Sequence, residues 1–412
     1  MLSGCELTKY RLNNGTGHIT RRRRLRWLAS AAMAVYAMTP AAMAVPLFTI
    51  QTPPALIQSV GLGGGLTAVS AASASEAWAV GAILAHWDGT TWTPFAIPVA
   101  NAVLLDVTDI ASNDAWAIGI LSQASGPTAN TVALHWDGTS WSEVATPPLP
   151  NGGAFFTSVT SVASNDVWIA GWATSPDGAH IDPLFEHWNG TAWSIVPASV
   201  PVPGFFEVEK ISADSANDIW AVGRNGQSTP TVQPFSFHWN GTTWSQVAVP
   251  KQPVGGELDG VVAVSPTNAW AVGSLTGEPI KAKPGSGGAS PKNPTANLIE
   301  HWNGKAWSVV ASPNLGPTAA NQNNHLKSVV ALSPTDLWVA GYSLVPDGLG
   351  KTITFALHGD GTSFTQQPTP DVSLSSVFFG AAVAQPSTVW FVGSGRSAGT
   401  FGAPFIATTN GG

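Results

Sequence analysis

A short segment built on His-Trp-Asp/Asn-Gly recurs along the chain and constrains its fold more than any other feature. It begins at His86, His135, His187, His238 and His301, each time with a second Trp six residues after the His. A weaker copy begins at His358, where Gly359 and Phe364 replace the two tryptophans. Self-similarity of this kind is typical of repeat architectures, in which each copy is one supersecondary unit.

A second signature precedes each copy and extends the repeat to seven units. A Trp-Ala-Val-Gly-like segment opens at Trp78, Trp116, Trp168, Trp220, Trp270, Trp338 and Trp390, and Gly follows three residues after every one. Twelve residues before each of these tryptophans stands Leu, Phe or Val: Leu66, Leu104, Phe156, Val208, Leu258, Leu326 and Phe378. These apolar runs, separated by short polar links, predict four strands in each unit.

The Asn-Gly and Asp-Gly pairs between aromatic residues predict a hairpin between the third and fourth strands. A two-residue type I′ turn at Asn303-Gly304 would place Trp302 opposite Lys305. The same register would place Glu300 opposite Trp307. Because side chains alternate along a strand, Trp302 and Trp307 should then share one face of the sheet, with His301 on the other.

Four-stranded units of this length in a closed ring predict an all-β, seven-bladed β-propeller made of antiparallel blades. The seventh unit ends after three strands. The segment Phe48–Pro53 resembles the fourth-strand segments elsewhere, so an N-terminal strand should complete the last blade and leave no open edge. Residues 45–412 are therefore expected to form one domain, with a flexible insertion at 274–297.

The motifs also resemble those of known propeller families. Trp-Ala-Val-Gly followed by Asp/Asn-Gly-x-x-Trp is similar to the repeats of BNR/Asp-box and photosystem-assembly-factor propellers, and more loosely to kelch and galactose-oxidase-like propellers. One departure is that Asp88–Trp92 is one residue shorter than the corresponding Asp-box run. The resemblance implies a fold, because the shared residues belong to the scaffold rather than to a site.

The first 44 residues differ from the rest and read as a secretory leader. Arg21–Arg26 precede an apolar run and an Ala-Met-Ala ending, which indicates a signal peptide cleaved after Ala44; an uncleaved anchor is the alternative. The mature protein would then be secreted, periplasmic or at the cell surface, with no membrane span. The only cysteine, Cys5, lies in this leader, so the remainder has no thiol or disulfide chemistry.

The charge balance excludes two classes of partner. Seven of the 17 Lys+Arg and one of the 24 Asp+Glu lie in the leader, which leaves 10 basic and 23 acidic residues and a net charge of about −13. Nucleic acid and anionic membrane surfaces need the opposite sign. A monomer that binds a glycan or a cell-surface protein is the expected state.

The repeated histidines and tryptophans are interpreted as framework residues. Equivalent positions in different blades lie far apart, whereas a metal ion needs three or four ligands around one point. Of the 19 tryptophans, 17 fall on repeat positions, and Trp172 is the one beyond the leader that does not. Neither a metal nor a cofactor is expected.

Candidate binding residues lie where the repeat is broken, since variable loops on a rigid scaffold commonly carry binding sites. One group falls in a variable loop: Trp172, Asp177, His180 and Asp182. The other stands near the start of the innermost strands and could ring the channel mouth: Asp106, Glu209, Lys210, Asp259 and Lys327.

The predicted function is a non-catalytic binding module for a glycan or a protein. A sialidase-type site needs an arginine cluster, whereas the mature chain has only Arg224 and Arg396, in different blades. A copper site of the galactose-oxidase type needs a cysteine. The alternatives that stay open are a carbohydrate-active hydrolase or lyase with acids at the channel mouth, and a structural component of an envelope or matrix.

Overall fold

The computed structural model describes twelve stretches of the chain: residues 48–51, 65–121, 131–149, 153–200, 204–226, 232–276, 295–315, 323–345, 351–370, 374–384, 387–396 and 402–409. All belong to the unit Pro46–Gly412, and the expected leader lies outside them. Every regular element in these stretches is a β-strand. No helix that could cross a membrane is found among them.

The strands form seven sheets, one for each repeat, which confirms the predicted blade count. Blade 1 contains β2 (Leu66–Ser73), β3 (Glu76–Gly81), β4 (Leu84–Trp87) and β5 (Trp92–Phe95). Blade 2 contains β6 (Ala102–Ala111), β7 (Asp114–Leu121), β8 (Thr131–Trp136) and β9 (Trp141–Glu143). Blade 3 contains β10 (Ala154–Ala163), β11 (Asp166–Thr174), β12 (Ile181–Trp188) and β13 (Trp193–Ile195).

Blade 4 contains β15 (Phe206–Ser215), β16 (Asp218–Asn225), β17 (Gln233–Trp239) and β18 (Trp244–Val247), with a short extra strand, β14 (Ala198–Ser199), parallel to β18. Blade 5 contains β19 (Gly255–Ser265), β20 (Asn268–Thr276), β21 (Thr295–Trp302) and β22 (Trp307–Val309). Blade 6 contains β23 (Asn324–Ser333), β24 (Asp336–Leu344), β25 (Thr352–Gly359) and β26 (Phe364–Gln367). Blade 7 contains β27 (Ser375–Ala384), β28 (Thr388–Arg396), β29 (Ala403–Thr409) and β1 (Phe48–Gln51).

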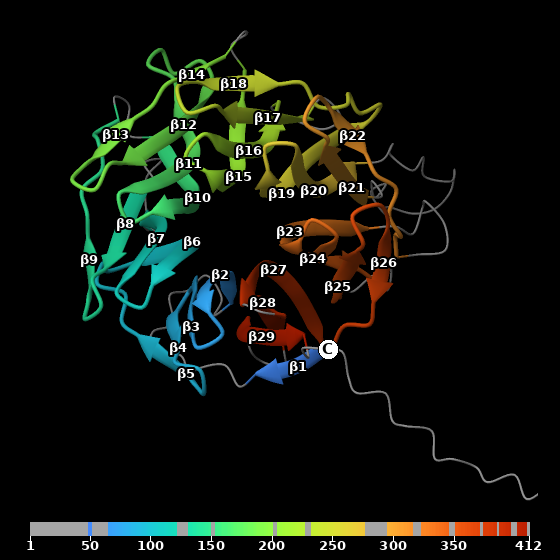
Figure 1. Ribbon diagram of the computed structural model, residues 1–412, viewed down its shortest axis with the longest axis horizontal. Coiled ribbons are helices and arrows are strands. Elements are labelled where there is room, and N and C mark those ends of the chain that lie inside the picture. The colour runs from blue at the N-terminus through green and yellow to red at the C-terminus, as the bar shows by residue number, and fades with distance from the viewer. Residues whose placement is uncertain are drawn as a thin grey trace, which may run out of the picture. The chain divides into compact units, whose positions relative to one another are not determined.

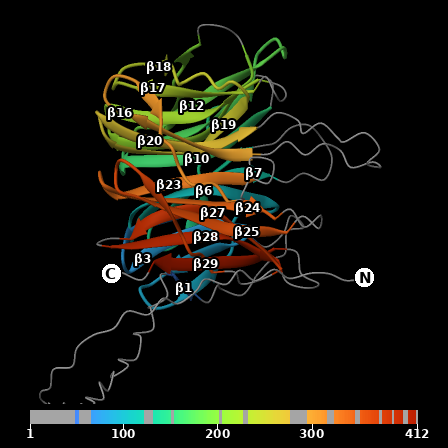
Figure 2. The ribbon, with the colours of Figure 1, turned by 90° about the vertical axis from the view of Figure 1, so that its right-hand side faces the viewer.

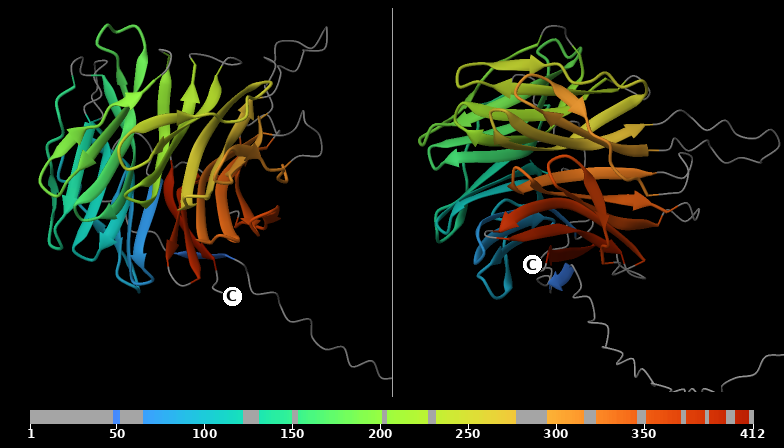
Figure 3. Two further views of the ribbon diagram at one scale, coloured as in Figure 1. Left: turned by 45° about the horizontal axis from the view of Figure 1, so that its top comes forward. Right: turned by 45° about the vertical axis from the view of Figure 1, so that its right-hand side comes forward.

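The blades stand in a ring around a common centre, and the first strand of each blade is innermost (Figure 1). Neighbouring inner strands contact one another all the way round, including β27 with β2. From the side, the strands of all blades run between the same two faces of the ring (Figures 2 and 3). Seven sheets of this arrangement form a β-propeller, as predicted.

The N-terminal strand closes the last blade. β1 pairs antiparallel with β29, with Phe48 opposite Thr409 and Gln51 opposite Ile406. Phe48 is buried, and its ring packs edge-on against Trp338 of blade 6 at 5.9 Å and against Phe391 at 5.2 Å. It therefore occupies the place that the second aromatic of the hairpin takes in the other blades.

Aromatic contacts between successive blades build the core. Trp78 of blade 1 packs against Trp136 and Trp141 of blade 2, at ring-centroid distances of 5.0 and 4.9 Å. Trp116, Trp168 and Trp220 make the same pair of contacts with the tryptophans of the blade that follows each of them. Each buried indole contributes a large apolar area to the interface between two blades, so the tryptophans at the repeat positions hold neighbouring blades together.

The hairpin prediction was wrong in register and right in the faces it assigned. Trp302 lies opposite Trp307 and Glu300 opposite Val309, so the loop holds four residues rather than two. The Asn303 side chain accepts hydrogen bonds from the backbone N–H of Lys305 at 3.0 Å and of Ala306 at 3.1 Å. This is an Asx turn, in which only Gly304 of the central pair has a positive φ (86°). The register moved by two residues, and a shift by two keeps every side chain on its face.

The repeated histidines are part of the same framework. Each one bonds to the residue that begins the second strand of its own blade, as in His238 Nε2 to Asp218 Oδ1 at 2.7 Å and His135 to Asp114 at 2.9 Å. Each also lies against the tryptophan of that strand, with Trp220 and His238 ring centroids 4.4 Å apart. The six histidines thus serve six separate blades.

Six residues of the expected flexible insertion at 274–297 lie in strands. Ser274–Thr276 continue β20, and Thr295–Asn297 begin β21, where Ser274 pairs with Asn297. Ser274 is only 3% exposed. The two strands extend because each finds a ladder partner in the other. The remaining residues, 277–294, lie outside the described stretches.

Candidate functional site

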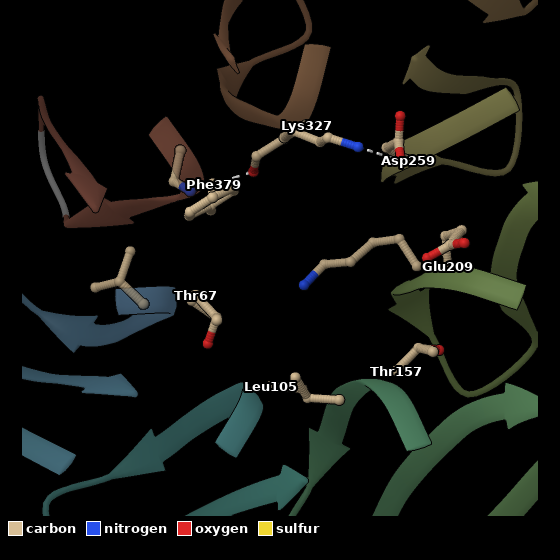
Figure 4. Close-up of a pocket in the computed structure, with 13 residues that line it drawn as sticks. Thr67, Leu105, Thr157, Glu209, Asp259, Lys327 and Phe379 are labelled. Atoms are coloured by element: carbon tan, nitrogen blue, oxygen red, sulfur yellow. Dashed lines mark hydrogen bonds and ion pairs between the residues drawn. The ribbon is translucent and has the colours of Figure 1, made fainter. Parts of the chain in front are cut away.

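Every innermost strand contains a β-bulge at the same position, and the bulged residue faces the channel. In each blade the register slips by one residue between the first and second strands. The residues skipped by the ladder are Thr67, Leu105, Thr157, Glu209, Asp259, Lys327 and Phe379. Figure 4 shows these seven side chains from the seven blades arranged around one cavity. Bulges commonly re-aim a side chain in this way.

The glycine of the Trp-x-x-Gly signature makes the bulge possible. Gly223 lies opposite Val208, the residue just before the bulge in blade 4. A Cβ on Gly223 would lie 2.0 Å from the carbonyl oxygen of Glu207, and the equivalent glycines meet the equivalent oxygens at 1.8 to 2.3 Å. A side chain at this position would therefore clash with the backbone. The repeated glycine places one residue per blade in the channel.

The cavity holds about 300 Å³ and has two unlike walls. Blades 4, 5 and 6 contribute Glu209, Asp259 and Lys327, whereas the remaining bulge residues carry no charge. Two of those, Thr67 and Thr157, use their hydroxyls to bond backbone carbonyls of the next blade, those of Leu104 at 3.0 Å and Val208 at 2.7 Å. With Leu105 and Phe379, they form an arc of predominantly apolar character, and Phe379 is 36% exposed.

The charged wall continues toward the mouth through the residues two positions before each bulge and their cross-strand partners. In blade 4 this pair is Glu207 and Arg224, with Arg224 Nε 2.9 Å from Glu207 Oε2. Arg224 also lies 3.6 Å from Glu209 and 3.4 Å from Glu257 of blade 5. Glu257 accepts a hydrogen bond from Ser274 at 3.3 Å. Blades 4 and 5 are thus joined by one arginine among three glutamates.

Blade 6 adds an aromatic pair and an ion pair. His325 stacks on Tyr342 with ring centroids 4.9 Å apart. Lys327 donates to Asp259 Oδ1 at 2.8 Å, from one blade to the next (Figure 4). The second oxygen of Asp259 has no hydrogen-bond partner in the described stretches, although that side chain is only 9% exposed. Tyr342 in turn contacts the ring of Phe379 at 6.3 Å, so the charged wall meets the apolar arc here.

Burial, together with neighbouring charges, shifts the pKa values of the groups at the mouth. Burial raises the pKa of Glu209 to about 7, and the charge of Asp259 adds to that rise while Arg224 and Lys327 oppose it. Burial also raises the pKa of Asp259, with Lys327 opposing. Burial and the charge of Lys327 lower the pKa of His325 to about 4. Glu209 can therefore gain or lose a proton near neutral pH, while His325 stays neutral.

Two of the predicted channel residues, Asp106 and Lys210, form an ion pair with each other. Asp106 stands one position past its bulge and is only 2% exposed. Its carboxylate accepts from Ser158 Oγ at 2.7 Å, from the Val159 N–H at 3.0 Å and from Lys210 Nζ at 2.7 Å. Ser158 accepts in turn from the Ile211 N–H at 3.2 Å. Asp106 thus ties blades 2, 3 and 4 together, and Lys210 also lines the cavity.

The predicted loop group is only partly assembled. His180 lies 3.6 Å from Asp177 and 3.3 Å from Asp182, and Asp177 accepts from Ser175 Oγ at 2.6 Å. These contacts close the exposed loop between β11 and β12. Trp172 pairs with Phe155 on the neighbouring strand and stacks on it at 4.3 Å. It occupies in blade 3 the position that Arg224 occupies in blade 4.

Sequence reasoning missed several residues of the mouth: Thr67, Leu105, Thr157, Phe379, Glu257, His325 and, as a site residue, Arg224. A usable signal was present, since each bulge residue directly follows the Leu, Phe or Val that stands twelve positions before the repeat Trp. No group of three or more His, Cys, Asp or Glu side chains suited to a metal ion is found within the described part of the chain.

Comparisons with known proteins give the fold alone. No protein-family model matches the chain, and no curated protein matches its sequence. Among solved structures it is similar to YCF48 from Cyanidioschyzon merolae, with 14% identity and a TM-score of 0.52 over 88% of this chain and 99% of that chain. YCF48 bound to D1 peptide gives 14% identity and 0.51 over 87% and 97%.

A polysaccharide lyase is similar to the same degree. The ulvan lyase bound to -[GlcA(1-4)Rha3S]- shares 11% identity, with a TM-score of 0.51 over 85% of this chain and 95% of that chain. The predicted resemblance to photosystem-assembly-factor propellers is thereby confirmed for the fold. Neighbours of one architecture include a peptide-bound and a glycan-bound protein, so the fold does not select between the two.

Proposed function

We propose that this protein is an exported, non-catalytic binding module that captures a segment of a protein or glycan partner at the channel mouth. The observation that carries the proposal is the bulge ring. Seven equivalent positions are held at one cavity by a repeated backbone bulge, yet they carry hydroxyl, aliphatic, aromatic, acidic and basic side chains. The histidine position at the other end of the blade is, by contrast, occupied by the same residue in six blades.

The cavity size and setting support capture of a segment rather than of a folded surface. About 300 Å³ is at the low end of ligand pockets, so it admits one side chain or one sugar residue. The structurally similar YCF48 is described bound to a peptide and the ulvan lyase bound to a glycan. Both are polymers that present such units in series.

A pull-down tests the proposal. The full chain, immobilised, is incubated with insoluble polysaccharides, cell-wall preparations and surface proteins, and the same panel is offered to the Phe379→Ala variant. Partner retention by the native protein and at least tenfold loss with Phe379→Ala supports the proposal. A partner retained equally by a Phe379→Ala protein of native melting temperature would overturn the channel mouth as the binding site.

Export is tested on the same protein. The basic and apolar order of residues 21–44 supports a cleaved leader. Cell fractionation followed by N-terminal sequencing should find the protein outside the cytoplasm and beginning at Val45. Recovery from the cytoplasm with Met1 intact would contradict export.

A carbohydrate-active hydrolase or lyase is the second candidate, favoured by one observation. Glu209 faces the cavity with a pKa raised to about 7, which suits an acid or base working near neutral pH. Release of soluble sugar from the same polysaccharides, lost in Glu209→Gln, would favour catalysis. Retention without release in the native protein favours the binding module.

A further inference from the structure

The charge balance at the channel mouth defines the sign of its ligand, if the mouth is the binding site proposed above. Four carboxylates line or border it: Glu207, Glu209, Glu257 and Asp259. Two cations, Arg224 and Lys327, lie among them. Lys210 adds no net charge because Asp106 already pairs with it. Carboxylates therefore exceed cations by two, and an anionic ligand would meet repulsion.

The excess is directed at the cavity. Glu209 faces it and is 29% exposed along its side chain, and its ion-pair contact within the described stretches is with Arg224, at 3.6 Å. Glu257 is 24% exposed beside it. Asp259 is nine-tenths buried at the cavity wall, with one oxygen on Lys327 and the other without a hydrogen-bond partner in the described stretches. A buried carboxylate oxygen without a donor can accept a hydrogen bond from a ligand.

The opposite arc suits a hydrocarbon chain. Phe379 and Leu105 line the cavity, and the hydroxyl of Thr67 is already bonded to backbone carbonyls. Lysine and arginine side chains combine an apolar stem with a charged head, and they bury the stem along apolar surface while the head reaches a polar partner. Lys327 shows that the wall accepts an ammonium, since it already holds one on Asp259.

We propose that the channel mouth binds a basic side chain, lysine or arginine, presented by a protein partner. Its charged head lies against Glu209 and Glu257, and its stem lies against Phe379 and Leu105. The apolar arc favours a protein over an amino sugar, because the ammonium of an amino sugar is attached directly to a polar ring without a methylene stem. The sulfated, uronate-containing glycan of the structurally similar lyase has the wrong sign for this mouth.

Saturation-transfer difference NMR with short peptides tests the proposal on the full chain. The probes are acetyl-Gly-Ser-X-Ser-Gly-amide peptides with X as lysine, arginine, norleucine or glutamate, each at about 5 mM, near the affinity expected for a single side chain. Saturation should reach the lysine methylenes most strongly. The norleucine and glutamate peptides should bind at least tenfold more weakly.

Matched variants separate the site from general attraction to an acidic protein. Glu209→Gln should weaken lysine-peptide binding about tenfold, while Glu143→Gln, which removes the same charge from exposed β9, should change it less than twofold. Equal effects of the two variants, equal binding of norleucine, or no transfer to the lysine peptide would overturn the inference. Partner capture that Phe379→Ala abolishes and Glu209→Gln leaves intact would sink the inference while sparing the proposed function.

Discussion

The two ends of each blade treat the repeat in opposite ways. At the hairpin end, six blades bond a histidine to the acid or amide that begins the second strand, and all six use an Asx turn. At the bulge end, seven blades use the same backbone irregularity to display different side chains. Repeat scaffolds build binding surfaces from equivalent positions of successive units. The difference separates what holds the ring together from what the ring presents.

Removing the strand that completes the ring should have the largest effect. Deletion of residues 46–54 removes Phe48 from Trp338 and Phe391, and leaves β29 as an unpaired edge. We expect a fall in melting temperature of roughly 10 °C, since loss of a buried aromatic alone costs about 3–5 kcal/mol. Differential scanning calorimetry measures it. An unchanged melt would show that the closure does not support the ring.

If the two ends have separate roles, replacing a framework residue should lower the free energy of unfolding far more than replacing a bulge residue. Trp220→Ala removes a fully buried indole between blades 4 and 5 and should cost about 3–5 kcal/mol. Leu105→Thr, which installs the bulge residue of blades 1 and 3, should cost less than about 1 kcal/mol. Urea denaturation of both variants gives the two values. Similar costs would erase the distinction between the two ends.

In blade 3 a buried glutamate stands at a framework position, and replacing it should stabilise the protein. Glu186 is fully buried, both carboxylate oxygens lack hydrogen-bond partners among the described residues, and burial raises its pKa to about 8. Blades 2 and 6 have Leu134 and Leu357 at this position. Glu186→Leu should therefore stabilise the protein at pH 8 by roughly 1–4 kcal/mol.

The same substitution should change how stability depends on pH. The folded state keeps the Glu186 proton up to about pH 8, whereas the unfolded chain loses it near pH 4.5. Between these values the folded state binds more protons, so native stability should fall as pH rises from about 5 to 8. Chemical denaturation across this range should show a shallower slope for Glu186→Leu. Glu300→Leu removes the equivalent buried carboxylate from blade 5 and serves as the comparison. It also removes the hydrogen bond that Gln252 donates to Glu300 at 3.3 Å.

At the bulge end, protonation should also control binding. Glu209 titrates near pH 7 among Arg224, Glu257, Asp259 and Lys327. Its carboxylate becomes protonated as pH falls, so affinity for the lysine peptide should drop roughly tenfold between pH 8 and pH 6. Glu209→Gln should flatten this profile at the weaker level. A profile that keeps its slope in Glu209→Gln would assign the titration to another group.

The smallest effect tests the uniformity of the turns. Asn240 accepts from the N–H groups of Thr242 and Thr243, both at 3.0 Å, and Asp88 does the same work in blade 1. Asn240→Asp should therefore lie within about 0.5 kcal/mol of the native protein. Asn240→Ala should cost about 1 kcal/mol because the turn loses its side-chain acceptor. Urea midpoints distinguish the two.

Much of the fold was predictable because repetition multiplies weak signals. Seven aligned units located the strands, and Phe48 was matched to Phe364 in the fourth strand of blade 6. The turn register was not predictable from Asn-Gly alone, since a side-chain acceptor such as Asn303 can bond two backbone N–H groups and lengthen the loop. The hydrogen bonds of the Asn303 side chain, rather than the turn preference of the Asn-Gly pair, set the length of this loop.

The site was predictable only where charge marked it. Glu209, Asp259 and Lys327 stood out as ionisable residues, whereas Thr67 and Phe379 looked like ordinary strand residues. The spacing of apolar residues also indicates the bulge. Leu104 and Val107 are both buried although they stand three residues apart. A regular strand cannot bury both on one face, so an extra residue must lie between them. Asp106 follows the bulged Leu105, and the same bulge directs its side chain toward blade 3, where it bonds Ser158.

The pairing of Phe48 with Thr409 also determines how the ring responds to force. β1 and β29 are antiparallel, and the chain leaves both strands at the same end of the pair. Tension between the two termini would load the hydrogen-bonded pairs one after another, as in opening a zipper, rather than all together in shear. A molecule tethered at both ends would therefore yield first at this seam, and blade 7 would open while six blades remained closed.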